Sequence, residues 1–114
     1  MPVISLLTTT ISSVDAGKQL AAKLVESKLA ACVQMDGPIE SVYRWQGQLC
    51  VETEFRLTCK TLPTCLDRAI LFVKQNHSYE TPEILIEQAE VSADYFQWLT
   101  QQVVEPEVVE PESP

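Results

Sequence analysis

The side chains best suited to chemistry in this 114-residue chain lie in one stretch, Asn76 to Glu83. It holds the only histidine of the chain, together with a tyrosine and two glutamates. An imidazole beside carboxylates suits a divalent ion of intermediate softness, such as Cu²⁺ or Zn²⁺. We therefore name His77, Glu80 and Glu83 as candidate metal ligands. A single histidine leaves such a site open unless water or a second subunit completes it.

The same stretch also allows purely structural roles. A helical pattern ends just before His77, so its imidazolium can lie near the negative pole of that helix. Glu80 can then face solvent, and Tyr79 can pack against its neighbours. The sequence leaves both interpretations open.

A second polar set follows one face of a predicted strand. Glu54 and Lys60 share that face, with Arg56 between them, and they can line a polar cleft for a small anion. Tyr79 and Trp45 are further candidates for lining a ligand cleft. The alternative is a solvated face with ion pairs that each contribute under about 1 kcal/mol. We expect Trp45 and Trp98 as anchors at an interface or in the core rather than as platforms on which a ligand stacks.

The composition argues against several classes of function. No G-x-S-x-G motif is present, and three scattered glycines cannot form a phosphate-binding loop. We therefore expect a protein that is not an enzyme. A net charge of -8 and a pI of about 4.5 argue against nucleic acid as a partner. No apolar run approaches the roughly 20 residues that span a bilayer, so we expect no membrane insertion.

The ends of the chain and its thiols indicate the compartment and the domain boundary. The first residues show no basic export signal. We therefore expect the cytoplasm, and in that reducing compartment the four cysteines, which form no CxxC pair, are expected as free thiols. Residues 105–114 hold four glutamates and three prolines and no basic residue. We predict one domain over residues 1–104 and a disordered acidic tail over residues 105–114.

The elements that must position these residues follow from periodicity. The pattern predicts an α+β fold in the order β-α-β-β-α-β, followed by an extra C-terminal helix. We expect a ferredoxin-like split βαβ sandwich with an antiparallel sheet and helices on one face. Gly37-Pro38 breaks the second strand of this order, so it is predicted as two segments. The first helix should be capped by Ser12, with Asp15 completing a capping box. The predicted strands cover Val3–Thr10, Leu29–Val33, Ile39–Gln46, Leu49–Lys60 and Glu83–Glu90, and the helices begin near Ser12, Pro63 and Ser92.

The strand from Leu49 to Lys60 is long for so small a domain. Twelve extended residues span about 40 Å, whereas a compact chain of this length has a radius of gyration near 13 Å. The hairpin must therefore bend sharply or project, and a projecting hairpin invites pairing with another copy. The alternative is a bulge near Gly37 or Gly47 that folds the hairpin back.

Five ordered motifs resemble the CutA family of divalent-cation tolerance proteins, and together they cover about residues 3–104. They are Lys28-Leu-Ala-Ala-Cys32, Ser41-Val-Tyr-Arg-Trp-Gln-Gly47, Glu52-Thr-Glu54 with Lys60-Thr61, His77-Ser-Tyr-Glu-Thr-Pro-Glu-Ile84, and Tyr95-Phe-Gln-Trp98. The resemblance implies a ferredoxin-like fold that assembles as a homotrimer similar to the PII signalling proteins, with clefts between subunits. Two positions depart from the family pattern: Ser78 replaces a proline, and Leu7 to Thr10 lacks the cysteine that some relatives carry there.

Three functions follow from these observations. The first is a cytoplasmic homotrimer linked to divalent-metal tolerance or binding, with Cu²⁺ as the chief candidate and Zn²⁺ as another; no cofactor is obligatory. The second is a PII-like sensor that binds a small metabolite in the intersubunit cleft. The third is a trimeric scaffold that recruits protein partners through its surface or its tail.

Overall fold

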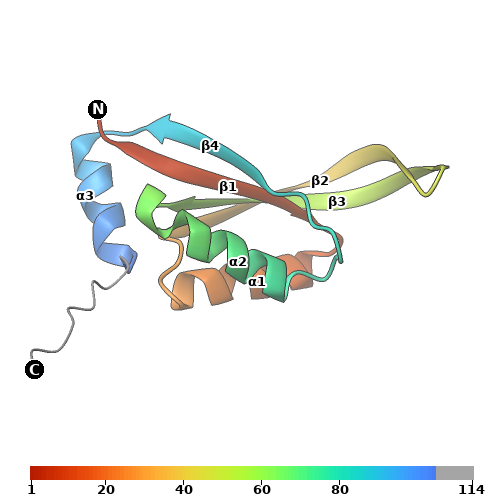
Figure 1. Ribbon diagram of the computed structural model, residues 1–114, viewed down its shortest axis with the longest axis horizontal. Coiled ribbons are helices and arrows are strands. Elements are labelled where there is room, and N and C mark those ends of the chain that lie inside the picture. The colour runs from red at the N-terminus through yellow and green to blue at the C-terminus, as the bar shows by residue number, and fades with distance from the viewer. Residues whose placement is uncertain (105–114) are drawn as a thin grey trace, which may run out of the picture.

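The computed structural model describes residues 1–104, and it contains one four-stranded antiparallel sheet with the first two helices packed on one face and the last helix at the end of the sheet (Figure 1). The strand order is β2-β3-β1-β4. This arrangement confirms the predicted ferredoxin-like α+β class with an extra C-terminal helix. The predicted acidic tail, and the scaffold role linked to it, lie outside the described residues. The elements are β1 (Val3–Ile11), α1 (Val14–Glu26), β2 (Cys32–Trp45), β3 (Gln48–Thr61), a 3₁₀ turn (Pro63–Cys65), α2 (Leu66–Asn76), β4 (Leu85–Glu90) and α3 (Ala93–Gln102).

The start of α1 differs from the prediction by one residue. Ser13, not Ser12, is the N-cap, and its Oγ accepts a hydrogen bond from the backbone N–H of Ala16 at 3.1 Å. The third residue after this cap is Ala16, so the predicted capping box with Asp15 is wrong. Asp15 instead lies in the first turn, where its charge complements the positive end of the helix.

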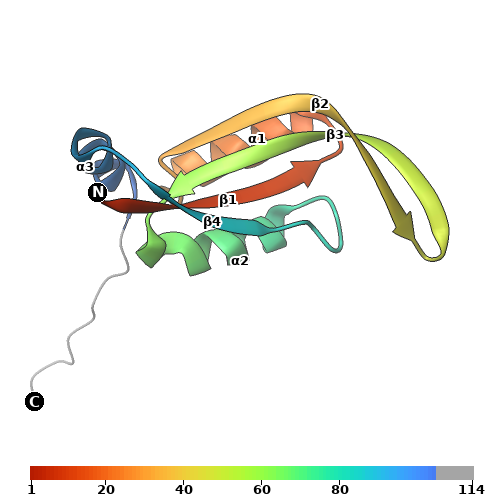
Figure 2. The same cartoon turned by 90° about the horizontal axis from the view of Figure 1, so that it is seen from above.

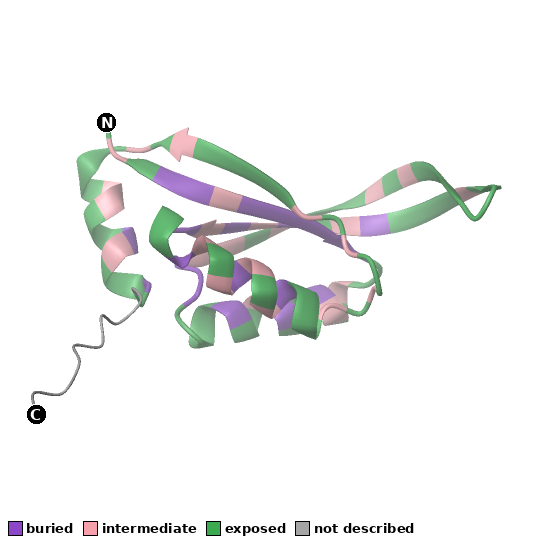
Figure 3. Ribbon diagram, in the orientation of Figure 1, coloured by how far each residue is buried: buried purple, intermediate pink, exposed green. Residues whose placement is uncertain are grey.

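The core lies between the sheet and the helices, as Figure 3 shows by the buried residues of β1 and of the inner helix faces. One cluster joins β1 and β3 to α1 and α2. A second lies beneath α3. The main buried members of the first are Leu7, Ile11, Leu20, Leu24, Leu57, Cys59, Ala69 and Val73, and those of the second are Ile4, Leu62, Cys65 and Leu99. Each cluster buries apolar surface from elements distant in sequence, which fixes the helices against the sheet.

A bulge joins two segments that the sequence divides. The predicted strands Leu29–Val33 and Ile39–Gln46 belong to one strand, β2, with a register shift between Asp36 and Ile39. Gly37 has φ of +140° and precedes a cis peptide bond to Pro38. A Cβ at Gly37 would lie 2.9 Å from Cδ1 of Phe55. The glycine is therefore required both by its backbone angle and by the close approach of β3.

Beyond this bulge the β2–β3 hairpin leaves the sheet. The pairing of β1 with β3 ends at Ile11 and Phe55, so residues 39–54, which we call the arm, pair only with each other. Figure 2 shows the arm curving outward past the end of β1. The molecule extends 59 × 38 × 23 Å and has a radius of gyration of 16.3 Å. The predicted projection is thus confirmed; the expected bulge is present, but it curves the arm without folding it back.

The helices are short. None of those in residues 1–104 combines the length and the apolar character that crossing a bilayer would need.

Candidate functional site

A groove of about 640 Å³ lies between the arm and the segment that follows α2. The arm curves toward this segment, which has no regular structure between the end of α2 and the start of β4 (Figure 2). One wall is therefore a β-ribbon and the other an irregular loop. The lining residues are Ser41, Val42, Tyr43, Trp45 and Glu54 from the arm, and Tyr79, Glu80, Thr81 and Glu83 from the loop.

The groove brings together five of the seven residues that the sequence predicts for a site. Trp45 and Glu54 meet Tyr79, Glu80 and Glu83, although about 25 residues or more separate the two sets in sequence. The curvature of the arm toward the loop therefore brings the two predicted regions together in one groove.

Lys60 lies apart from this groove. Its Nζ is 5.7 Å from the centroid of the Tyr95 ring, so it packs against α3 rather than near Glu54. Six extended residues separate Lys60 from Glu54, a distance of about 20 Å along the strand. A shared strand face was correctly inferred from the alternation, but it does not bring these two side chains into one cleft.

His77 lies beneath the groove and fixes the loop to the end of β1. Its Nε2 is 2.8 Å from the carbonyl oxygen of Thr10, and its Nδ1 is 2.9 Å from the backbone nitrogen of Tyr79. Because the Tyr79 N–H donates to Nδ1, Nε2 must carry the proton that is donated to Thr10. The ring is therefore neutral with both nitrogens engaged. A metal ion at His77 would have to displace one of these hydrogen bonds.

Burial explains the protonation state of His77. Loss of solvent lowers the pKa of His77 below its ordinary value, although the Thr10 carbonyl and the charge of Glu54 act in the opposite direction. The neutral ring thus holds the loop to the end of β1 by hydrogen bonds. The expected imidazolium at the negative pole of α2 does not describe the state of His77 at neutral pH.

Glu54 is the most buried charged group of the site. It is 8% exposed, and its Oε2 accepts a hydrogen bond of 2.8 Å from the hydroxyl of Tyr79. Burial acts to raise the pKa of Glu54, but hydrogen bonds from Ser41, Tyr79 and Thr10 and the proximity of His77 outweigh it, so the pKa lies below its ordinary value. Burial and the neighbouring Glu54 raise the pKa of Tyr79 to about 12. The pair is therefore a neutral phenol donating to a charged carboxylate.

Glu80 and Glu83 lie on the exposed side of the groove. Within residues 1–104, no three His, Cys, Asp or Glu side chains converge closely enough to hold a metal ion. The groove of a single chain is thus acidic without presenting an assembled metal-ligand set.

Ser41, Val42, Tyr43 and Thr81 line the groove but were not predicted. Ser41, Tyr43 and Trp45 occupy alternate positions of β2, and alternate residues of a strand share a face. Since Trp45 was named from the sequence, this alternation was the signal that would have added Ser41 and Tyr43. No comparable signal marks Thr81.

Sequence comparison with known proteins identifies relatives of this chain. A sequence model described as CutA1 divalent ion tolerance protein matches residues 5–102. The chain is 42% identical over 76 residues to a chloroplastic CutA 1 protein of Oryza sativa, covering 67% of this chain and 43% of that protein. It is 36% identical over 91 residues to the divalent-cation tolerance protein CutA of Thermus thermophilus, covering 79% and 88%. The chain spans about half the length of the plant relatives.

Solved structures extend the agreement to the fold. The crystal structure of CutA1 from Oryza sativa superposes with a TM-score of 0.85 at 36% identity, covering 93% of this chain and 97% of that one. The family model covers nearly the whole described chain, and the structural match includes both the sheet and its helices. The chain therefore belongs to the CutA1 divalent ion tolerance protein family.

Proposed function

We propose that this protein is a non-enzymatic homotrimer that supports divalent-metal tolerance by binding metal, chiefly Cu²⁺, at the acidic groove. The observation that carries the proposal is the meeting of Glu54, Glu80 and Glu83 in one groove of a protein from a divalent ion tolerance family. Carboxylates and an imidazole are ligands that Cu²⁺ and Zn²⁺ accept. Since one chain presents no assembled ligand set, a neighbouring copy or a released His77 ring would complete the coordination.

The exposed surface of the arm supports assembly. Val42, Leu49 and Val51 are 62%, 75% and 56% exposed on a ribbon that leaves its own domain. Among residues 1–104, the strands β2 and β4 form the two edges of the sheet, and each pairs with a neighbour on one side alone. A contact between two unlike edges is heterologous and closes into a ring when its rotation permits. We propose that the PII-like trimer implied by the sequence motifs is this ring.

Calorimetric titration with Cu²⁺ tests the metal proposal. We expect the wild type to bind, and we expect the double variant Glu80→Gln with Glu83→Gln to bind at least tenfold more weakly because two anionic donors are lost. Glu26→Gln with Asp67→Asn, two exposed acidic residues of α1 and α2 outside the groove and away from the sheet edges, is the matched control. His77→Ala assigns the imidazole: unchanged affinity in this variant would remove His77 from the ligand set. Equal binding by both double variants would contradict the groove as the site.

A second function, a sensor of a small molecule, is favoured by the size of the groove. Its volume of about 640 Å³ lies within the range of roughly 300–1,000 Å³ typical of small-molecule sites. A metal ion alone would fill a small part of it. A screen of metabolites by thermal shift, in the presence of a chelator, tests this function independently of metal binding.

We also propose a reducing compartment, the cytoplasm, because all four cysteines are free thiols in the structure. Relatives carry other labels, chloroplastic in Arabidopsis thaliana and periplasmic in Archaeoglobus fulgidus. Fractionation of cells with an antibody to this chain tests the assignment.

A further inference from the structure

We propose that the groove binds an organic cation, an amine or a quaternary ammonium group with an apolar body. This inference rests on the small-molecule function proposed above for the same groove, and it adds the chemical class of the ligand. Three observations support it. Among residues 1–104, Glu54 is a buried carboxylate without a counterion, aromatic side chains line the groove, and the lining residues include no basic group.

The first observation is the unpaired charge of Glu54. Buried charged groups in proteins are normally paired, because removal from water penalises an isolated ion heavily. Glu54 is 8% exposed and receives hydrogen bonds from neutral hydroxyls. Within residues 1–104 the only ion pair joins Arg56 to Asp36, at 3.2 Å. The carboxylate thus lies at the groove without a cationic partner from the described chain.

The second observation is the aromatic lining. Tyr43, Trp45 and Tyr79 account for a third of the nine lining residues, and Val42 adds apolar surface. The faces of aromatic rings attract cations through the ring quadrupole, and indole does so most strongly. Tyr79 contacts the Glu54 carboxylate, and Tyr43 and Trp45 line the same groove further along the arm. A carboxylate and aromatic rings within one groove form a combination that recognises ammonium groups carrying hydrocarbon.

The third observation separates this ligand from the alternatives. The lining contains three glutamates and no lysine, arginine or histidine, so phosphates and carboxylates would be repelled. A metal ion prefers several converging donors. Within residues 1–104 no such set is assembled, so metal binding at this groove requires donors from a neighbouring copy or a released His77 ring. Aromatic and aliphatic walls add nothing for a metal ion, but they contribute directly to binding an organic cation.

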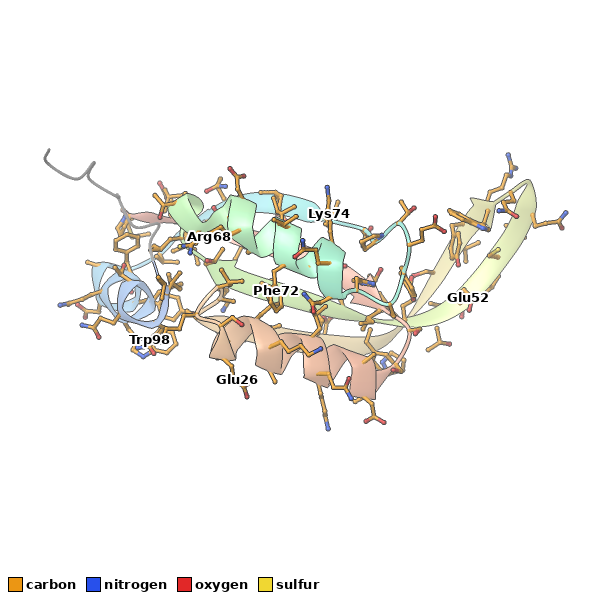
Figure 4. The ribbon with its side chains drawn as sticks, turned by 60° about the horizontal axis from the view of Figure 1, so that its bottom comes forward. Glu26, Glu52, Arg68, Phe72, Lys74 and Trp98 are labelled. Carbon is orange, nitrogen blue, oxygen red and sulfur yellow. The ribbon has the colours of Figure 1, made fainter. Side chains whose placement is uncertain are left out.

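Choline and its neutral isostere, in which carbon replaces nitrogen, form a suitable pair of probes. The two molecules have nearly the same shape and differ in charge. The chain contains two tryptophans, and Trp45 lines the groove while Trp98 lies on α3 at the opposite end of the molecule from the arm residue Glu52 (Figure 4). In the Trp98→Phe variant all tryptophan fluorescence comes from Trp45, so its change on titration reports binding at the groove.

The expected result is saturable binding of choline to the full chain in its native assembly, with the isostere at least about tenfold weaker. Glu54→Gln keeps the side-chain oxygen that accepts from Tyr79 but removes the charge, and we expect it to weaken choline binding by at least about tenfold. Trp45→Leu should weaken binding in a similar way when followed by calorimetry. Trp98→Leu is its matched control, since the two rings are 53% and 44% exposed.

Two outcomes would overturn the inference. One is equal binding, or no binding, of choline and its isostere; the other is a Trp45→Leu variant that binds choline as well as Trp98→Leu does. Light scattering on each variant separates loss of the ligand site from loss of assembly. The Cu²⁺ titration is carried out on the same samples, so failure of choline binding with intact Cu²⁺ binding contradicts this inference alone. The reverse result contradicts the metal proposal alone.

Discussion

The body of the domain and the arm are made from the same strand, β3, yet they bury it very differently. Leu57 and Cys59 are fully buried against α1 and α2, whereas Leu49 and Val51, further toward the tip, are mostly exposed. The body is held by apolar burial between layers. The arm is held by the hydrogen bonds of a two-stranded ribbon, which alone is marginally stable in water. The half of the hairpin within the body therefore contributes most of the stability, whereas the arm half provides exposed surface for association.

The sharpest test of this division compares two leucines. Leu7→Ala removes a fully buried side chain of the first core cluster, and we expect it to lower the free energy of unfolding by about 3 kcal/mol. Leu49→Ala removes a side chain of the arm that is exposed in the single chain, and for the dissociated chain we expect a loss under about 1 kcal/mol. Urea unfolding at fixed protein concentration measures both. Equal losses would show that the arm is buried as deeply as the core in the native assembly.

The junction between body and arm should tolerate change less well than the tip. Gly37→Ala places a Cβ on a backbone with φ of +140° and against Phe55, so we expect a loss of about 2 kcal/mol. Gly47 at the tip has φ of +77° but open space around it, and Gly47→Ala should cost about 1 kcal/mol. Thermal unfolding ranks the two variants. A larger effect at Gly47 would contradict the close approach at the bulge.

The contact between the loop and the arm is expected to contribute less to the free energy of unfolding than the close packing at Gly37. Tyr79→Phe removes the hydroxyl that donates to Glu54, and hydrogen bonds to charged groups contribute roughly 1.5 kcal/mol or somewhat more. Urea unfolding measures the loss. Tyr43→Phe is the matched control, because Tyr43 lines the same groove and is partly exposed. Losses of the same size in both variants would contradict a specific role for the Tyr79–Glu54 bond.

The smallest expected effect is a dependence on pH. The pKa of His77 is lowered in the folded chain from its ordinary value of 6.5, so the unfolded chain takes up a proton first as the pH falls. Stability should therefore decrease as the pH falls below about 6.5. The lowered pKa of Glu54 gives a loss of the same sign, but in the separate window below its ordinary value of 4.5.

Urea midpoints measured between about pH 8 and about pH 5.5 isolate the histidine window. His77→Gln should be less stable at every pH but should show a flatter profile. An unchanged slope would show that another group is responsible.

Most of the body could be predicted from local pattern. The four-residue repeat of Leu20 and Leu24 in α1 and the alternation along β3 are set by helix and strand geometry, and neither depends on distant partners. The order of elements then restricts the topology to very few arrangements. Gly37-Pro38 allowed both a strand end and a bulge, because this pair gives the same signal whether a strand stops or bends.

The site was less accessible to prediction. The residue types in the loop identified its chemistry, but the meeting of Glu54 with Tyr79 depends on the curvature of the arm, which arises from the geometry of the bulge. The engagement of both nitrogens of His77 depends on the position of the Thr10 carbonyl at the end of another strand. Distances between elements of this kind are not encoded in the spacing of residues.

The bulge at Gly37 also lies at the base of a long ribbon, so a small rotation there produces a larger displacement at the tip. Seven residues on each side of the ribbon separate the bulge from the hairpin turn, a length of about 23 Å. A rotation of about 5° at the base therefore displaces the tip by about 2 Å, by the geometry of a stiff ribbon of that length. A small change of backbone angle at the bulge would therefore alter the distance between Trp45, near the tip, and the loop, without any change in the packing of the two core clusters.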